Sequence, residues 1–291
     1  MTSTEVIVAS VSSTASSRSS RWPLRGAAYA ALGLYAVVSG YPFVLMVSGA
    51  FKDNREVLTN PWPVPRRPTF ETLRTTWQVL DFGAYVGNTV FIVAASLVLI
   101  LVIFPLAAYA FAVMRFPLRT LFFGLFLSAL FVPGVTVLLP IVLLDYRLGV
   151  LGTPWGVILP IVNGSGPIAI LLLRSYFQAI PRELREAALL DGCGEFRVFW
   201  RVYYPLARPA LVTVAMLNFV GIWNEYVLPS VTLNDPEQYT LPLGLQNLLS
   251  ANVVNWNQVM AGSVIIVVPV IVVFVFLQRY FVEGLRGSMK G

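Results

Sequence analysis

The sequence predicts an all-α membrane protein with six transmembrane helices and a cytosolic helical hairpin between the fourth and fifth. Of its 291 residues, 57% are hydrophobic and only 12% are charged, with a mean hydropathy of +0.75. A soluble domain carries about 25% charged residues, so this composition indicates a membrane protein. The charged segment between the fourth and fifth apolar runs has helical periodicity, which predicts the hairpin.

The predicted spans are the apolar runs long enough to cross a bilayer, which takes about 20 residues. Several contain proline or glycine, which membrane helices tolerate because neighbouring helices satisfy the freed backbone groups. The six runs are 27–50, 86–113, 121–144, 154–177, 208–230 and 259–281.

The distribution of Lys and Arg predicts that both ends of the chain are cytoplasmic. With that orientation, 14 of the 20 basic residues fall on the cytosolic side, whereas the outer loop 231–258 contains none. Membrane topology and contact with anionic lipid headgroups therefore account for the net charge of +6. The charge does not call for a nucleic-acid partner. The lone cysteine, Cys193, excludes an internal disulfide and falls on the cytosolic side.

The two ends of the chain differ in composition from the predicted six-span domain 23–281. Residues 1–22 are rich in Ser and Thr, which predicts a disordered cytosolic tail. A processed targeting segment is the alternative, although Glu5 stands where such a segment carries positive charge. Residues 282–291 are expected to form a second cytosolic tail.

The predicted hairpin covers residues 181–209. Pro181 suits the first turn of a helix, and Gly192 suits its end, where a left-handed residue is common. A second periodic apolar run follows, and Pro205 and Pro209 end it before the next span. The run consists of Phe196, Phe199, Trp200 and Tyr203. One side of the hairpin is therefore apolar and needs a partner.

The spacing of this segment resembles the "EAA" signature of ABC-importer permeases. The match covers more than 20 residues, and it departs mildly at Tyr204, where leucine is usual. The matching residues are Glu186, Ala187, Ala188, Asp191, Gly192, Val202, Pro205 and Leu206. The resemblance implies a pair of coupling helices that dock into a cytosolic ATPase. An amphipathic loop lying on the lipid surface is the alternative.

Nearly the whole chain resembles the second permease subunit of the maltose-type carbohydrate importers. The resemblance implies a second permease, two ATPase subunits that bind ATP and Mg, and an extracytoplasmic substrate-binding protein. It assigns ATPase coupling to the matched hairpin residues together with Phe199. It also implies that the C-terminal tail runs between the ATPase subunits, through Gly284, Arg286, Gly287 and Lys290. A frayed basic end on the membrane surface is the alternative.

The end of the fifth span, Gly221–Pro229, contains an acidic residue at a costly position. Glu225 should face the bundle interior or water, because a carboxylate is expensive to bury in hydrocarbon. The run Trp223-Asn224-Glu225 resembles the fifth-span region of carbohydrate importers, which implies a solute path. Asn218 lies two turns earlier and is a weaker candidate. Interfacial anchoring is preferred for Trp223 and Tyr226, whereas both interpretations stay open for Asn224 and Glu225.

Three further segments allow two interpretations each. The loop 51–85, helical from about Thr69, is a structural lid or a contact surface for the binding protein. Asp145 and Arg147 form an exposed local pair, or contact a partner. The run Asn163–Pro167 is a packing kink, which is preferred, or lines a cavity with free backbone groups.

The residues that enzymes use are scarce. Histidine is absent, and the sequence contains no nucleotide-binding loop, clustered metal ligands or paired catalytic carboxylates. We therefore expect a subunit without catalytic residues, metal or bound cofactor. An ion-coupled secondary transporter is the alternative, but Glu225 alone would serve its relay. A membrane-embedded enzyme is less consistent with the sparse acids.

Overall fold

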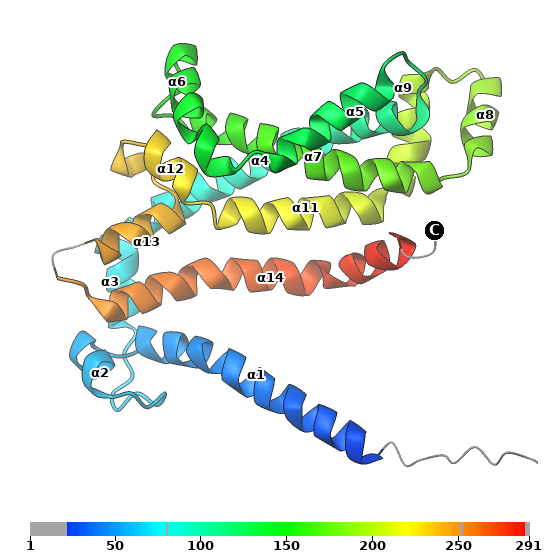
Figure 1. Ribbon diagram of the computed structural model, residues 1–291. Helices are drawn as coiled ribbons and strands as arrows, with labels where there is room; N and C mark the ends of the chain where they lie inside the picture. Colours follow the sequence, from blue (N-terminus) through cyan, green and yellow to red (C-terminus); the bar gives the residue numbers. More distant parts are fainter. Residues whose placement is uncertain (1–21, 80, 251–252, 289–291) are drawn as a thin grey trace, which may run out of the picture. The chain divides into compact units, whose positions relative to one another are not determined.

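The computed structural model describes residues 22–79, 81–250 and 253–288, and every regular element in them is a helix (Figure 1). The principal α-helices are α1 (Trp22–Ala50), α2 (Asn54–Thr59), α3 (Glu71–Val79), α4 (Phe82–Val113), α5 (Arg119–Ser128), α6 (Leu138–Leu148), α7 (Pro154–Ala179), α8 (Arg182–Leu190), α9 (Glu195–Val198), α10 (Tyr204–Leu206), α11 (Arg208–Trp223), α12 (Val227–Thr232), α13 (Leu241–Leu249) and α14 (Trp256–Ser288). Short 3₁₀ turns and one π-helical turn complete the described part. Residues 1–21, which include most of the predicted N-terminal tail, lie outside it.

Four helices in the described residues are long and apolar enough to cross a membrane. They are Ala28–Ala50, Phe82–Val113, Pro154–Ala179 and Trp256–Phe276. The count rises to as many as six if each of two bent helix pairs forms one span. This agrees with the predicted six-span, all-helical class, with two spans built differently from the rest.

The third predicted span, 121–144, is broken near its middle. The segments Arg119–Phe131 and Gly134–Leu148 meet at a bend of 98°. Val132 has an extended backbone and precedes Pro133, and a residue before proline disfavours the helical conformation. The apolar run is therefore long enough to cross a membrane, but it does not form one continuous helix.

The fifth predicted span, 208–230, is interrupted too. Helix α11 ends at Trp223, and α12 begins at Val227 after a short break. At its other end α11 bends by 76° from the segment Glu195–Leu206. This places Asn224 and Glu225 in a break between two helices, where the sequence pattern predicted the last turns of one continuous span.

The chain divides into two compact units, and the larger one comprises residues 46–291. Its hydrophobic core centres on α4 and α7. Gly166 allows these helices to approach closely, since a Cβ there would lie 2.7 Å from Cε1 of Phe104. Helix α7 remains helical through Asn163–Pro167, so the predicted interruption is a stretch of small residues within a continuous helix. Helices α11 and α14 pack beside this pair, and the Trp223 indole N–H donates to the Ile266 carbonyl at 3.0 Å.

The ends of these helices carry different elements. Figure 1 shows α8 and α9 at one end of α4, α7 and α11, and α12 and α13 at the other. At the second end, the predicted helix after Thr69 is confirmed as α3, with the short α2 before it. Buried Lys52 fixes the intervening loop, because its Nζ donates to the carbonyls of Asn60 (3.0 Å) and Trp62 (2.6 Å).

Asp145 does not form the exposed local pair with Arg147 that its position in the sequence favoured. It lies within α6, is only 2% exposed, and its Oδ2 has no hydrogen-bond partner among the described residues. The turn after α6 folds back over it, with the N–H groups of Val150 and Leu151 donating to the Asp145 carbonyl.

The C-terminal helix is longer than predicted. Helix α14 continues to Ser288, so the backbone at Gly284, Arg286 and Gly287 is helical where the sequence suggested a flexible tail from residue 282. The apolar part that could cross a membrane ends at Phe276. Lys290 lies outside the described residues.

Candidate functional site

The hairpin, here residues Arg182–Leu206, turns at the predicted glycine. Gly192 has a φ of +80°, a left-handed conformation that glycine adopts without the steric penalty other residues meet. The Gly192 N–H donates to the Leu189 carbonyl and the Cys193 N–H to the Ala188 carbonyl, both at 3.0 Å. These two bonds form a Schellman motif, which closes the last turn of α8 and directs the chain into α9.

The apolar side of the hairpin finds its partner within this chain. Phe199 and Tyr203 are both 1% exposed and lie in a π-helical turn. Their rings pack on Tyr109 of α4, with centroids 5.4 and 5.0 Å away, and near Phe177 of α7. Phe199 was predicted among the coupling residues, but it fixes the base of the hairpin and offers no exposed contact surface.

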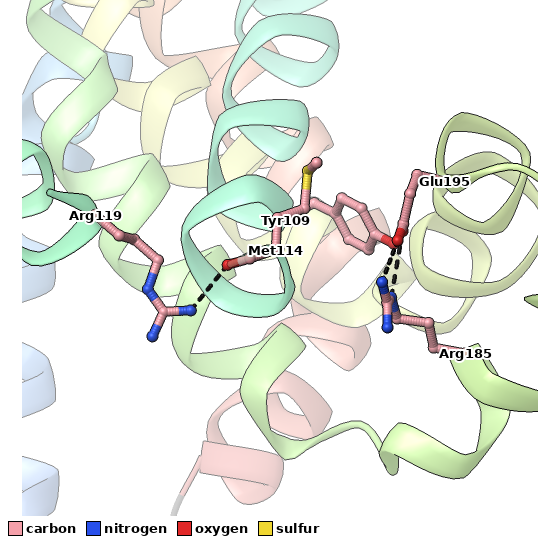
Figure 2. A network of polar contacts seen from close by, with 5 residues as sticks. All are labelled: Tyr109, Met114, Arg119, Arg185 and Glu195. Carbon is pink, nitrogen blue, oxygen red and sulfur yellow. Dashed lines mark hydrogen bonds and ion pairs between the residues drawn. The ribbon is translucent and has the colours of Figure 1, made fainter. Parts of the chain in front are cut away.

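A polar network joins both arms of the hairpin to α4 (Figure 2). Glu195, in the first turn of α9, forms an ion pair with Arg185 of α8 and accepts a hydrogen bond from the Tyr109 hydroxyl at 2.7 Å. Arg185 foremost, then Tyr109, holds the pKa of the Glu195 carboxyl below its usual range, opposed by desolvation. The same ion pair raises the pKa of Arg185.

No pattern in the sequence predicted this network. Arg185 precedes the Glu-Ala-Ala motif and Glu195 follows the turn, so their spacing of ten residues has no helical periodicity. Tyr109 is 86 residues away from Glu195. The sequence does show opposite charges, Arg185 and Glu195, on either side of a predicted tight turn. Such a turn can bring the two side chains onto facing helices.

The remaining predicted coupling residues lie on the outside of the hairpin. Glu186, Ala187, Asp191 and Gly192 are exposed, and Ala188 is half-buried against the core. The structure adds Leu190, which no sequence pattern singled out, and leaves Phe196 of the predicted apolar run exposed, unlike Phe199 and Tyr203. Leu190 is 89% exposed and Phe196 is 69% exposed, next to the turn. These two exposed apolar side chains on either side of the turn are candidates for contact with a partner.

A hollow of about 900 Å³ lies beside the hairpin. It is bounded by the last residues of α4 and α7, the start of α5, and α8. Its charged lining residues are Arg115, Arg119, Arg182, Arg185, Glu186 and Glu195. Arg119 also closes the end of α4, since its Nη1 donates to the Met114 carbonyl at 3.0 Å (Figure 2).

A smaller hollow of about 220 Å³ lies between α7 and α11. Two of the predicted solute-path residues, Asn218 and Glu225, line it, and Gly164 and Ser165 of α7 face them. Asn218 Nδ2 donates to the Val214 carbonyl at 2.9 Å, which leaves its amide oxygen available. Glu225 Oε1 accepts from the Leu228 N–H at 3.1 Å and so caps the start of α12.

The neighbouring aromatic and amide residues play other parts. Asn224 is exposed and bonds to the Val220 carbonyl of its own helix, and it does not line the small hollow. Trp223 is 3% exposed and braces α11 against α14, so it is not the interfacial anchor that the sequence favoured. Tyr226 is 40% exposed, as that interpretation expects. Among the described residues, no cluster of three or more Asp, Glu and Cys side chains could hold a metal.

Comparison with known proteins identifies relatives along most of the chain. Residues 103–287 match the family model described as "Binding-protein-dependent transport system inner membrane component". The probable ABC transporter permease YurM of Bacillus subtilis (strain 168) is 34% identical, with 89% of this chain and 87% of YurM covered. The arabinooligosaccharides transport system permease AraQ of the same organism is 36% identical, covering 86% of this chain and 90% of AraQ.

A solved structure has the same fold. It is a bacterial ABC transporter involved in the import of the acidic polysaccharide alginate, and one of its chains is 25% identical to this one. The superposition has a TM-score of 0.80 and covers 90% of this chain and 98% of that chain.

Proposed function

The chain belongs to the family of binding-protein-dependent transport system inner membrane components, and we propose that it helps to translocate a carbohydrate. In this proposal it is the second-type permease subunit of an ATP-driven importer. The substrate class is supported by relatives named for arabinooligosaccharides and alginate import. It is a multi-pass permease of the inner membrane.

The hairpin is the proposed coupling element, and its attachment to α4 is the observation that carries this. An element that transmits motion has to be rigid internally and fixed to the part that it moves. The Schellman turn supplies the first property, and the Tyr109–Glu195–Arg185 network with the buried rings of Phe199 and Tyr203 supplies the second.

The outer surface of the hairpin would contact a cytosolic ATPase. Glu186 and Asp191 offer charge, and Ala187 offers a flat exposed surface between them. Leu190 and Phe196 add the apolar contacts that commonly anchor an interface. When ATP closes two ATPase subunits, the hairpin would move with them and tilt α4, α7 and α11, which gives alternating access.

The small hollow between α7 and α11 is the proposed part of the solute path. Asn218 and Glu225 supply a donor and acceptors for sugar hydroxyl groups, while Gly164 leaves space near the backbone. Asn224 would have to reorient to take part, because its amide is bonded within α11.

The other partners follow from this assignment. A second permease would complete the path, and ATP with Mg would bind to the two ATPase subunits. An extracytoplasmic binding protein would dock at the end formed by α2, α3 and α13. Both chain ends would be cytoplasmic, and Gly284, Arg286, Gly287 and Lys290 would reach the ATPase interface.

Reconstituted transport tests the function. Proteoliposomes with the assembled transporter should take up an oligosaccharide only when ATP and the loaded binding protein are both supplied. An ion gradient without ATP should support no uptake; uptake driven by such a gradient would establish the secondary-transporter alternative. A panel of neutral and acidic oligosaccharides would identify the solute.

A charge reversal tests the coupling assignment. Glu186→Lys should leave the protein in the membrane but weaken ATPase retention and uptake. Glu237→Lys, an exposed glutamate in the loop between α12 and α13 at the other end of the helices, is the matched control for ATPase retention. Normal uptake by the Glu186 variant would contradict the assignment. Removing residues 285–291 should likewise alter ATPase retention without preventing membrane insertion.

A further inference from the structure

The large hollow beside the hairpin carries an excess of positive charge. Arg185 and Glu195 neutralise each other in the one ion pair found among the described residues. Three other arginines, Arg115, Arg119 and Arg182, then stand against one other glutamate, Glu186. The charged lining therefore has a net charge of +2, and in the part of the chain that the structure describes none of these three arginines has a carboxylate within ion-pair distance.

The three arginines come from three separate elements that converge on the same space. Arg115 follows the end of α4, Arg119 begins α5, and Arg182 begins α8. Arg119 uses one nitrogen on the Met114 carbonyl and keeps its other donors available. Figure 2 shows Arg119 and Arg185 approaching the end of α4 from different sides.

The start of α8 adds to this positive potential. Pro181, which precedes α8, provides no side-chain cap, so the first N–H groups of the helix have no side-chain partner among the described residues. Backbone N–H groups at a helix start attract anions, above all phosphate. The guanidinium fork provides paired donors that match phosphate oxygens, and three of them on different elements can surround such a group.

We propose that this hollow binds a phosphate group, carried by an anionic phospholipid or by a small soluble phosphate compound. Its volume of about 900 Å³ leaves room for the substituents of a phosphate ester. It lies at the ends of the apolar helices α4 and α7, where basic pockets in membrane proteins bind lipid headgroups. The bound phosphate would link α4, α5 and α8, and so stabilise the position of the hairpin.

The binding test uses the assembled transporter with the full-length chain. It would be placed in nanodiscs of phosphatidylcholine with increasing phosphatidylglycerol, and retained lipid would be measured by native mass spectrometry. Arg115→Gln combined with Arg182→Gln should lower phosphatidylglycerol retention about tenfold. Arg119 is left unchanged because it also holds the end of α4.

The control removes the same charge from the same region. Arg197→Gln combined with Arg201→Gln affects two exposed hairpin arginines that do not line the hollow. This control should retain phosphatidylglycerol as the unaltered transporter does. Equal loss in both double variants would overturn the proposal, since it would show a general charge effect. Arg115→Lys with Arg182→Lys keeps the charge and should show an intermediate loss.

Two further measurements separate the sources of phosphate and the rival occupant. If glycerol 3-phosphate or inorganic phosphate at millimolar concentration displaces the lipid, the site accepts a soluble phosphate; if neither competes, the lipid is the ligand. An acidic segment of the ATPase is the rival occupant. Loss of ATPase subunits from the Arg115/Arg182 glutamine variant, with lipid retention unchanged, would overturn the proposal. Because binding is measured without ATP, its failure would leave the proposed transport function untouched.

Discussion

The hairpin and the break after α11 both interrupt the apolar helices, but different contacts hold them in place. The hairpin is held across elements, by Glu195 to Arg185 and Tyr109 and by two buried rings. The break is held locally, because Glu225 caps the next helix and Asn224 bonds to its own helix. Contacts between distant residues suit an element that transmits motion, because they fix it to the helices that it moves. Contacts within neighbouring residues leave the Glu225 carboxylate beside the hollow between α7 and α11, where it could exchange partners.

The glycine turn gives the largest expected difference between the two regions. Gly192→Val forces a β-branched residue into a left-handed conformation, which costs about 1–2 kcal/mol or more. The turn would open and the arms of the hairpin would separate, so ATP-dependent uptake should fall about tenfold. Initial uptake rates in proteoliposomes, normalised to protein in the membrane, measure this effect.

Gly194→Val is the matched control. Gly194 has a φ of −75°, and a Cβ there would meet no atom within 4 Å, so valine fits the existing backbone. Its uptake should stay near that of the unaltered protein. If both valine variants lost activity to the same extent, side-chain bulk at the interface would explain the loss, and the conformation of the turn would not.

The packing of α7 against α4 underlies both regions and gives the next largest effect. Gly166→Ala places a Cβ 2.7 Å from Phe104, which should destabilise the protein by about 1–3 kcal/mol. Gly164→Ala, two residues away, meets open space and should be neutral or slightly stabilising in the helix. Thermal melting of the purified complex compares them, and equal melting temperatures would show that α4 moves aside.

The sequence predicted the parts of this architecture that depend on local pattern. Long apolar runs gave the helices, and Asp191-Gly192 gave the turn with its left-handed glycine. The breaks at Pro133 and at Asn224–Tyr226 were not predicted. An apolar run predicts the length of a span but does not show where the helix axis bends. Proline marked the first break, but prolines at positions 105, 160 and 269 lie within continuous helices.

Contacts between distant residues could not be predicted in the same way. The periodic run from Phe196 to Tyr203 correctly indicated one apolar side but not its partner, which is Tyr109 and Phe177 of this chain. Asn218 and Glu225 were placed together correctly, since both lie near one helix end. Trp223 was misassigned because tryptophan near a span end is enriched in the headgroup layer, whereas here its indole N–H bonds to α14.

The polar network of the hairpin should give a smaller, measurable effect. Tyr109→Phe removes the hydroxyl that donates to Glu195 and keeps the ring, so the hairpin should lose about 1 kcal/mol of stabilisation. Arg185→Gln should behave similarly, and the double variant should lose less than the sum. Tyr176→Phe is the control, because its hydroxyl makes only a 3.3 Å bond to the Leu206 carbonyl.

The same network has a defined pH dependence. The pKa of Glu195 is lowered in the folded protein, so its contribution is complete above the unfolded-state value and is lost as the pH falls through the folded value. The protection factors of the α9 N–H groups in hydrogen exchange, which correct for the intrinsic effect of pH on the exchange rate, should therefore fall on acidification below about pH 4.5. In Arg185→Gln this pH-dependent loss should be smaller, because the folded and unfolded pKa values of Glu195 then lie closer together. Identical profiles in the two proteins would show that the ion pair does not cause the pH dependence.

The local fastening at Glu225 should give the smallest structural effect and a selective functional one. Glu225→Gln keeps an oxygen that can accept from the Leu228 N–H, so α12 should stay capped and assembly should be near normal. If the carboxylate binds solute hydroxyl groups in the hollow between α7 and α11, uptake should fall about two- to tenfold while basal ATPase activity is unchanged. Asn224→Asp is the neighbouring control, because Asn224 does not line the hollow. Reduced assembly of the Glu225 variant would make the residue structural. Unchanged uptake and assembly would indicate that the carboxylate lies in water. The only role left for Glu225 in the comparison with the hairpin would then be to cap the start of α12.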